Sequence, residues 1–386
     1  MVDGNEKFTG RLGDEAGERQ FALEFRQFLS SGAVLSAAGL VQKKDPHGGI
    51  GLFATRPLLR GFELEIPTRW VLDVTSARST RLGQGGLGFY SPLSASARND
   101  IRKLAVTEEE VLLLVLADAR PTRQSGSPWA PYAEILPQTA PDVGSWPAGV
   151  AQDLLRGTDL GAALLEAEKD LAALHAKVVS VWGVLSTELL SANDDVKPPA
   201  VSLDDLRWAR GMLLSRRFPD LVGRGGGASP GIWGDAGSMV PLLDFLNHGP
   251  HIMGVKTRGF EDECWDGTVG GCAKGNEIGV VSVGNSAPCA KGTEVLHNYG
   301  ARKSNEELMA MYGFALARNP SDRVSLLIPC KGGGEPVRCH VDRTGITEEI
   351  FEALLSVTVM GSGEGGGGSA EQEEEGGGDE DEAELA

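Results

Sequence analysis

Two segments about fifty residues apart in the 386-residue sequence constrain its fold more than any other feature. The first is residues 239–248, MVPLLDFLNH, a mostly apolar segment that ends in an amide and an imidazole side chain. This pattern predicts a short buried strand that presents Asn247 and His248 at its end. Side chains of this kind form a site only if a second polar segment of the chain meets them.

The second segment is residues 294–314, EVLHNYGARKSNEELMAMYGF. Its pattern predicts a strand over Glu294–His297, a sharp turn at Tyr299 and Gly300, and a helix that begins in the polar run 305–307. Both segments therefore deliver polar or aromatic side chains where a strand ends. This arrangement indicates a site that is built by convergence and not by one local motif.

The residue types at these ends suit the binding of a cation better than hydrolysis. The sequence has neither a G-x-S-x-G nucleophile motif nor an H-E-x-x-H zinc motif. A buried tyrosine beside a glycine turn can instead face a positive group, because aromatic faces stabilise positive charge. Hydroxyl and carbonyl oxygens can also accept the polarised C–H groups of a sulfonium.

Residues 49–54, GIGLFA, match the dinucleotide fingerprint GxGxxA and offer an alternative interpretation. That fingerprint needs a strand before the glycines and a helix after them. The preceding residues QKKDPH read as a loop, and Pro57 stands where the helix would have to run. We therefore reject a Rossmann-type site and expect a glycine loop that lets a ligand approach the backbone.

The remaining patterns predict mostly helices between residues 78 and 237. Thr107 and Glu110 have the spacing of a capping box. The predicted elements are helices over 21–38, 108–120, 153–175, 203–217 and 346–360, a hairpin-rich region over 48–74, an extended connector over 128–147, a glycine-rich loop over 222–237, an irregular hairpin over 251–276 and a last strand over 325–329.

The net charge of −18 is unevenly distributed. Residues 361–386 contain ten acidic residues and no lysine or arginine, and are otherwise almost all glycine and other small residues. Such a tail cannot bury enough apolar surface to fold, so we expect it to be disordered. The rest of the chain is only mildly acidic, and it has no basic face of the kind that binds nucleic acid.

The five cysteines form no CxxC or CxC pair, which argues against a zinc site and a disulfide framework. The apolar run at 111–117 is too short to span a membrane, so we expect no membrane partner. The N-terminus has the pattern of neither a secretory signal nor a transit peptide. We therefore expect a cytoplasmic or nuclear protein, and a plastid location only if the N-terminus is incomplete.

The motifs DFLNH and NYGxxKSNEELxxxYGF resemble the two C-terminal signatures of SET-domain protein methyltransferases. The resemblance is strongest to the long-insert branch, which includes the plant Rubisco large-subunit lysine methyltransferases and the actin-histidine methyltransferases. It extends to residues 47–74, 127–137 and 206–218, so that it covers roughly residues 40–325 in the order of the family.

The resemblance implies an α+β fold with a β-rich SET core, a pseudo-knot and a mostly helical insert. It also implies a shortened C-terminal region, because relatives carry a further helical domain there. The expected organisation is an N-terminal helical segment over 1–39, the SET core over 40–77 and 238–325, the insert over 78–237, a residual C-terminal segment over 326–360 and the acidic tail over 361–386.

The activity implied is the transfer of a methyl group from S-adenosylmethionine to a lysine of a protein substrate. By resemblance, the catalytic residue is Tyr299, and the residues that bind the cofactor are Gly48, Gly49, Ile50, Arg216, Asn247, His248, Tyr312 and Phe314. The residues expected to line the substrate channel are Phe218, Asp244 and Tyr299, and no metal is expected.

Phe218 favours lysine as the target. In the family the actin-histidine enzyme has Asn at this position, and an aromatic wall suits an aliphatic lysine stem. A protein-histidine methyltransferase and a non-catalytic SET-like binding module remain the alternatives. The shortened C-terminus favours the binding module, whereas the retained Asn247, His248 and Tyr299 oppose it. The partner expected is a lysine-containing protein, and the chain itself is expected to be a monomer.

Overall fold

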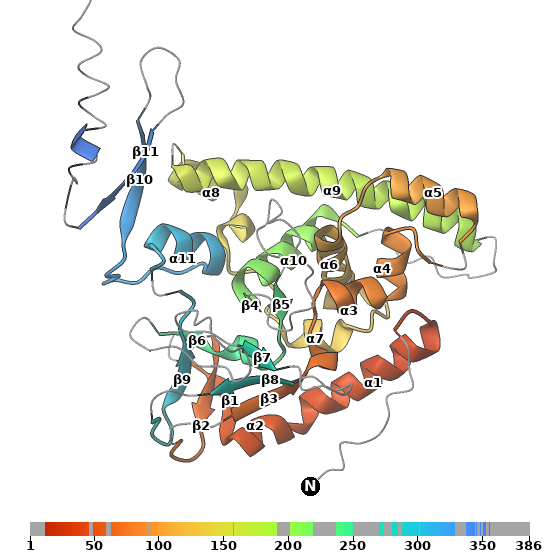
Figure 1. Ribbon diagram of the computed structural model, residues 1–386, viewed down its shortest axis with the longest axis horizontal. Coiled ribbons are helices and arrows are strands. Elements are labelled where there is room, and N and C mark those ends of the chain that lie inside the picture. Colours follow the sequence, from red (N-terminus) through yellow and green to blue (C-terminus); the bar gives the residue numbers. More distant parts are fainter. Residues whose placement is uncertain are drawn as a thin grey trace, which may run out of the picture. The chain divides into compact units, whose positions relative to one another are not determined.

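The computed structural model describes residues 12–45, 49–58, 63–90, 93–156, 158–190, 201–218, 237–249, 270–272, 280–284, 288–300, 302–328, 337–343, 345, 348, 350–352 and 355. It divides into two compact units, Met1–Asp322 and Arg323–Ala386. The first unit combines small sheets with a group of helices (Figure 1). The predicted α+β class is therefore confirmed.

The N-terminal region forms two helices, α1 (Glu15–Ser31) and α2 (Ala33–Ala38). The single helix predicted over 21–38 is wrong, because Gly32 between them adopts a left-handed conformation with φ of 59°. Asp14 caps the start of α1 by accepting a hydrogen bond from the Gly17 N–H. α1 buries Phe21 and Phe25 against two tryptophans, Trp70 and Trp129, at ring distances of 4.8–5.6 Å.

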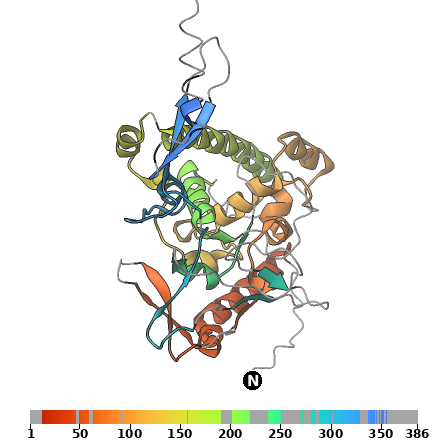
Figure 2. The ribbon, with the colours of Figure 1, turned by 60° about the vertical axis from the view of Figure 1, so that its left-hand side comes forward.

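Within the described residues the strands form four small sheets, and Figures 1 and 2 show their strands. One sheet has the order β1-β2-β9-β6, the second β3-β8-β7, and two hairpin-like pairs are β4-β5 and β10-β11. Their bounds are β1 Leu40–Lys44, β2 Ile50–Ala54, β3 Glu63–Pro67, β4 Arg217–Phe218, β5 Ser238–Met239, β6 Asn247–His248, β7 Gly270–Cys272, β8 Val280–Gly284, β9 Glu294–His297, β10 Arg323–Ile328 and β11 Val337–Asp342.

The first sheet contains the parallel pair that positions the predicted site. β6 pairs with β9 in parallel, with Asn247 opposite Leu296 and His248 opposite His297. β2 pairs with the other edge of β9, so that the residues 49–54 lead into a strand and not into a helix. This placement agrees with the rejection of a dinucleotide fingerprint. The threading of a pseudo-knot stays a prediction.

Residues 239–248 do not form the single strand that was predicted. The chain leaves β5 at Met239, turns at Leu242, passes through a 3₁₀ turn η4 (Leu243–Phe245) and then enters β6. Leu242 has a φ of 69°, which is rare for a residue with a branched side chain. The apolar run therefore reflects burial of a bent segment, and alternation alone could not distinguish it from a strand.

The helical part contains α3 (Val74–Ser79), α4 (Arg81–Gly86), α5 (Ala95–Lys103), α6 (Glu108–Asp118), α7 (Ala130–Ile135), α8 (Ala148–Leu154), α9 (Asp159–Leu190) and α10 (Leu203–Arg216), with 3₁₀ turns η1 (Thr68–Trp70), η2 (Pro121–Arg123) and η3 (Val143–Ser145). Thr107 and Glu110 form the predicted capping box of α6. The helix predicted over 203–217 is confirmed as α10.

Two predictions for the helical part are wrong. The helix predicted over 153–175 is split, because α8 ends at Leu154 and the 32-residue α9 starts only at Asp159. Residues 128–147 are not an extended connector, since they contain α7 and η3. Pro131 lies in the first turn of α7, where proline is compatible with a helix because its missing N–H needs no partner there.

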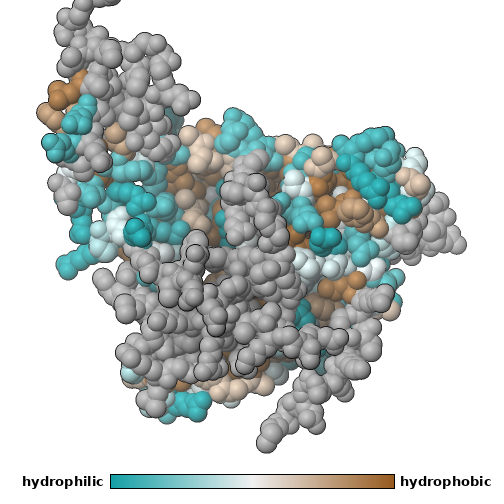
Figure 3. Space-filling view, in the orientation of Figure 1, coloured by the Kyte–Doolittle hydropathy of each residue, from teal (hydrophilic) through white to brown (hydrophobic). Residues whose placement is uncertain are grey.

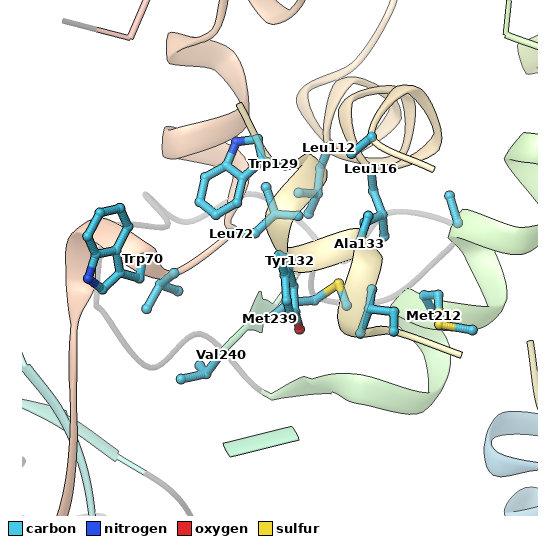
Figure 4. Packing of buried hydrophobic residues seen from close by; sticks show 14 of the residues in the cluster. Trp70, Leu72, Leu112, Leu116, Trp129, Tyr132, Ala133, Met212, Met239 and Val240 are labelled. Atoms are coloured by element: carbon cyan, nitrogen blue, oxygen red, sulfur yellow. The ribbon is translucent and has the colours of Figure 1, made fainter. Parts of the chain in front are cut away.

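The main hydrophobic core joins the helices to the sheets. Figure 4 shows Trp129, Tyr132, Leu112 and Leu116 packed with Leu72 and Met239 from the strand region. Trp129 and Tyr132 are fully buried, so each contributes a large apolar area to folding. On the face seen in Figure 3, hydrophilic and apolar residues are interspersed among the residues drawn in colour.

The second unit contains an antiparallel hairpin of β10 and β11, in register from Arg323 opposite Asp342 to Ile328 opposite Val337. The strand predicted over 325–329 is confirmed as β10, but it is not the last strand, because β11 follows and pairs with it. The helix predicted over 346–360 is described only at scattered residues. Most of the loops predicted over 222–237 and 251–276, and all of the acidic tail, lie outside the described residues.

Candidate functional site

The parallel pair β6 and β9 brings the two C-terminal segments together at Tyr299. The Tyr299 hydroxyl donates a hydrogen bond to the Leu246 carbonyl oxygen at 2.8 Å. The Tyr299 N–H donates to Nδ1 of His248 at 3.1 Å, and the Gly249 N–H donates to the His297 carbonyl oxygen at 2.9 Å. These bonds fix the tyrosine between strands that are about fifty residues apart in the chain.

Tyr299 lies at the centre of an aromatic cluster. Its ring centroid lies 4.6 Å from that of Tyr312, 5.2 Å from His248 and 5.7 Å from His297. The full aromatic cluster consists of Phe218, His248, His297, Tyr299, Tyr312 and Phe314. Such a set of ring faces is suited to hold a positively charged group.

Helix α11 (Asn305–Tyr312) positions the last two members of the aromatic cluster. A capping box of Ser304 and Glu307 starts the helix. Gly313 ends it with a φ of 74°, and a Cβ atom at this position would lie 1.8 Å from the Pro141 carbonyl oxygen. Glycine is therefore needed both for the turn and for the close approach to Pro141.

The Asn247 side chain connects β6 to the glycine loop and to β9. Its Nδ2 lies 2.7 Å from Glu294 Oε1, 3.2 Å from Asp45 Oδ2 and 3.3 Å from the Ile50 carbonyl oxygen. A Cβ atom on Gly51 would lie 2.2 Å from Glu294 Oε1, so this glycine allows the carboxylate to reach Asn247. The arrangement places Ile50 beside the end of β6.

Arg216 ends α10 and points toward the turn that precedes β6. Its Nη1 donates to the Asp244 carbonyl oxygen at 2.9 Å and lies 3.3 Å from Asp244 Oδ2. The Tyr132 hydroxyl donates to the same Oδ2 atom at 3.0 Å. The Asp244 side chain is fully buried, and the Arg216 side chain is 17% exposed.

The titratable members of the aromatic cluster are neutral near pH 7. Burial raises the pKa of the Tyr299 hydroxyl well above its ordinary value, and raises the pKa of Tyr312 to about 12. Burial likewise lowers the pKa of His248, and lowers the pKa of His297 to about 4. Tyr299 is therefore a hydrogen-bond donor, and His248 Nδ1 is an acceptor with its proton on the other ring nitrogen.

The structure brings together most of the predicted site residues. Tyr299, His248, Tyr312 and Phe314 share ring contacts, and Phe218 joins them through His297 at a ring distance of 5.7 Å. Asn247 meets the glycine loop at Ile50 through a hydrogen bond. Gly49 closes the turn that precedes Ile50, because its carbonyl oxygen accepts a hydrogen bond from the Asp45 N–H. Gly48 lies outside the described residues.

Two residues of the site were missed in the sequence. Tyr132 lies in the segment 127–137, but nothing local to that segment indicates that its hydroxyl reaches Asp244, 112 residues away. His297 could have been identified, because it precedes Tyr299 by two residues and alternate residues of an extended chain share a face. Asp244, predicted to face the substrate channel, instead has its carboxylate against Tyr132 and Arg216.

Among the described residues, no group of three or more His, Cys, Asp or Glu side chains could hold a metal ion. In the same part of the chain, the helices lack the length and apolar character needed to cross a bilayer.

No family model matches the chain. Curated relatives include the chloroplastic [fructose-bisphosphate aldolase]-lysine N-methyltransferase of Arabidopsis thaliana, 27% identical over 307 residues, which are 79% of this chain and 54% of that protein. The chloroplastic ribulose-1,5-bisphosphate carboxylase/oxygenase large subunit N-methyltransferase of Pisum sativum is 25% identical over 310 residues, 80% of this chain and 54% of that protein. The chain thus spans about half the length of the curated relatives it matches.

Solved structures with a similar fold include Rubisco LSMT bound to sinefungin and monomethyllysine. It has a TM-score of 0.57 at 19% identity, over 88% of this chain and 70% of that chain. The SET domain of LSMT bound to lysine and AdoHcy has a TM-score of 0.54 at 20% identity, over 81% of this chain and 61% of that chain. The chain therefore has the LSMT SET-domain fold, as the resemblance implied.

Proposed function

We propose that this chain transfers a methyl group from S-adenosylmethionine to a lysine side chain of a protein. The observation that carries the proposal is Tyr299, whose hydroxyl is held by the Leu246 carbonyl oxygen within the aromatic cluster of a SET-domain fold. The names of the curated relatives support the reaction class, because both are N-methyltransferases and the Arabidopsis thaliana name specifies lysine.

The residues present fit the chemistry of the cofactor. Arg216 offers a guanidinium for a carboxylate, and its buried Nε has no hydrogen-bond partner among the described residues. Ile50 and the Asn247 amide provide a backbone edge and a polar side chain. The predicted cofactor residues are Gly48, Gly49, Ile50, Arg216, Asn247, His248, Tyr312 and Phe314, of which the last three contribute ring faces next to Tyr299.

When bound, S-adenosylmethionine would supply an electrophilic methyl group to the neutral target amine, with the sulfur–methyl bonding electrons left on sulfur and the amine proton released. The chain contributes position and electrostatics to this step. Because burial keeps Tyr299 protonated, its hydroxyl oxygen can accept polarised C–H groups while its O–H donates a hydrogen bond to the Leu246 carbonyl oxygen. The neutral rings around it do not repel a positive reactant.

Phe218 supports lysine as the target residue. It is 7% exposed and packs on His297, which in turn packs on Tyr299, so an aromatic wall stands near the catalytic hydroxyl. Such a wall suits the aliphatic stem of lysine. The partner proposed is therefore a lysine-containing protein, and its identity depends on surfaces beyond this site.

The compartment and the oligomeric state also remain proposals. The names of both curated relatives include "chloroplastic", which supports the plastid that was predicted beside the cytoplasm and nucleus for an incomplete N-terminus. Fractionation of source cells, followed by immunodetection of the chain, would decide between these compartments. We retain the predicted monomer, which sedimentation of the purified chain can test.

The test is a methyl-transfer assay with labelled S-adenosylmethionine, protein extract and the purified chain. Tyr299→Phe should slow labelling by about 100-fold, comparable with the loss of one positioned transition-state group. Tyr90→Phe is the matched control, because Tyr90 packs in a separate hydrophobic cluster and should leave the rate unchanged.

Mapping of the labelled peptide separates the alternatives. Label on a lysine supports the proposal, whereas label on a histidine with lysines unmodified would assign a histidine methyltransferase. If calorimetry shows cofactor binding but no extract protein is labelled by the wild-type chain, the binding module replaces the enzyme as the preferred function.

A further inference from the structure

Arg216, a proposed cofactor residue, belongs to a buried network of hydrogen-bonded side chains. The Tyr132 hydroxyl donates a hydrogen bond to Asp244 Oδ2 at 3.0 Å. Arg216 Nη1 donates to the Asp244 carbonyl oxygen at 2.9 Å and to Asp244 Oδ2 at 3.3 Å. The three residues come from α7, η4 and the end of α10. They therefore connect the helical part of the chain to the turn that leads into β6.

The Asp244 carboxylate cannot reach a target amine in this arrangement, because it is fully enclosed. Its side chain has no exposed surface, and Tyr132 is also completely buried. Figure 4 shows the Tyr132 ring among the core side chains, with its hydroxyl at the edge of the cluster. The carboxylate therefore faces inward, toward the phenol and the guanidinium.

Burial makes this carboxylate costly for stability. Desolvation raises its pKa, and the Arg216 charge and the Tyr132 hydrogen bond act in the opposite direction. Its Oδ1 atom has no hydrogen-bond partner in the described part of the chain. An apolar residue at such a position would commonly serve stability as well or better. A role in fixing geometry explains a buried ion pair here better than a role in stability does.

The contacts of Arg216 show which geometry is fixed. Asp244 engages only Nη1, through its backbone and its side chain together. The Arg216 Cζ atom also lies 5.8 Å from the ring centroid of Phe245. The guanidinium has restricted rotation, because one of its nitrogens has two acceptors and a ring lies beside it. The other N–H donors of the guanidinium stay available for a carboxylate.

We infer that Tyr132 and Asp244 form a positioning pair that orients the guanidinium of Arg216 toward the carboxylate of the bound cofactor. The inference rests on the proposed function, and it assigns the Asp244 side chain to Arg216 and not to the target lysine. Tyr132 acts indirectly, because its hydroxyl fixes the position of the Asp244 oxygen that Arg216 contacts.

The test compares two ligands that differ only in the group that Arg216 would bind. Isothermal titration calorimetry of the full chain is performed with S-adenosylmethionine and with decarboxylated S-adenosylmethionine. The measured quantity is the affinity for S-adenosylmethionine divided by the affinity for decarboxylated S-adenosylmethionine. A general loss of fold would weaken both ligands, whereas loss of orientation at Arg216 lowers only the affinity of the ligand that has the carboxylate.

Tyr132→Phe should reduce this ratio by about tenfold, the loss expected for one hydrogen bond to a charged group. Arg216→Met gives the ratio without any guanidinium, and Tyr132→Phe added to Arg216→Met should reduce it no further. Tyr90→Phe is the control at a distant tyrosine and should leave the ratio at its wild-type value.

Three outcomes would overturn the inference. An unchanged ratio in Tyr132→Phe would show that this residue only supports the fold. A raised ratio would show that Asp244 competes with the cofactor for Arg216. A wild-type ratio that Arg216→Met does not alter would remove Arg216 from the carboxylate site. Failure of the wild-type chain to bind S-adenosylmethionine at all would instead contradict the proposed function itself.

Discussion

At the scale of single residues, the aromatic cluster has no formal charge of its own near pH 7. The two histidines are neutral because burial lowers the pKa of both, and the two tyrosines are neutral because burial raises theirs. The charges lie around the cluster, on Arg216, Asp244 and Glu294, and all three affect the pKa of Tyr299. A cationic ligand would therefore meet ring faces first.

The first prediction concerns His297 and the pH dependence of stability. Its pKa is about 4 in the folded chain and about 6.5 without burial, so the unfolded chain binds more protons between these values. His297 therefore contributes fully to stability above pH 6.5, and the contribution is lost as the pH falls toward 4. By linkage the loss amounts to about 3 kcal/mol.

Urea unfolding of the wild-type chain and of His297→Leu between pH 4 and pH 7.5 measures this effect. The variant should lose much of the slope of unfolding free energy against pH. A smaller slope should remain, because the lowered pKa of His248 acts in the same direction. Equal slopes for the two proteins would show that His297 is not buried in its neutral form.

At the scale of elements, the short helix α11 positions part of the aromatic cluster. It has a capping box at its start, it supplies Tyr312 to the aromatic cluster, and Phe314 follows directly after its C-cap Gly313. α6 begins with the same type of capping box, at Thr107 and Glu110, but no part of α6 contacts the aromatic cluster through a described ring or hydrogen bond.

These two caps provide a matched pair of substitutions. Ser304→Ala and Thr107→Ala should each reduce the unfolding free energy by about 1 kcal/mol, because each removes one capping acceptor. Only Ser304→Ala should also weaken binding of S-adenosylmethionine, since fraying of α11 would displace Tyr312. Thermal unfolding and calorimetry of both variants measure the two effects, and equal affinities would contradict a positioning role for α11.

The elements that could be predicted from the sequence are those with local signals. The capping box of Thr107 and Glu110 was visible as a spacing, and it starts α6 as expected. The strand Glu294–His297 and the helix after it were also predicted, because alternation, a glycine turn and a polar helix start follow one another there. Each of these signals involves residues that are neighbours in the chain.

The features that escaped prediction depend on distant contacts or on single backbone angles. Gly32 divides the first helix with a left-handed conformation, which composition does not distinguish from a tolerated helical glycine. Leu242 turns the chain with a positive φ that the surrounding packing imposes on a leucine. The contact of Tyr132 with Asp244 closes a separation of 112 residues, and no periodicity in either segment encodes it.

At the scale of the whole molecule, the helical part of the chain contacts α11 directly. The Leu160 N–H at the start of α9 donates to Glu306 of α11 at 3.2 Å. Pro141 approaches Gly313 so closely that no side chain fits between them. These two contacts help to hold α11 in place, and with it Tyr312 of the aromatic cluster.

The last prediction follows from where the site ends in the chain. Every described residue that we propose to bind the cofactor lies at or before Phe314, within the unit Met1–Asp322. Asp322 itself stabilises this unit, because its carboxylate accepts hydrogen bonds from the N–H and the side-chain amide of Asn305, at 2.9 and 3.0 Å. Asn319 adds a hydrogen bond from its side-chain amide to the Lys303 carbonyl oxygen at 2.9 Å.

A chain ended after residue 322 should therefore bind S-adenosylmethionine with an affinity within about twofold of the full chain, a difference of less than 0.5 kcal/mol. A chain ended after residue 318 is the matched control, because it loses the bonds of Asn319 and Asp322 and should unfold at a lower temperature. Calorimetry and thermal unfolding of the two fragments measure these effects.

If the 322-residue chain fails to bind the cofactor while it remains folded, residues after 322 contribute to the site. Retained cofactor binding with lost methyl transfer would instead assign those residues to recognition of the protein substrate.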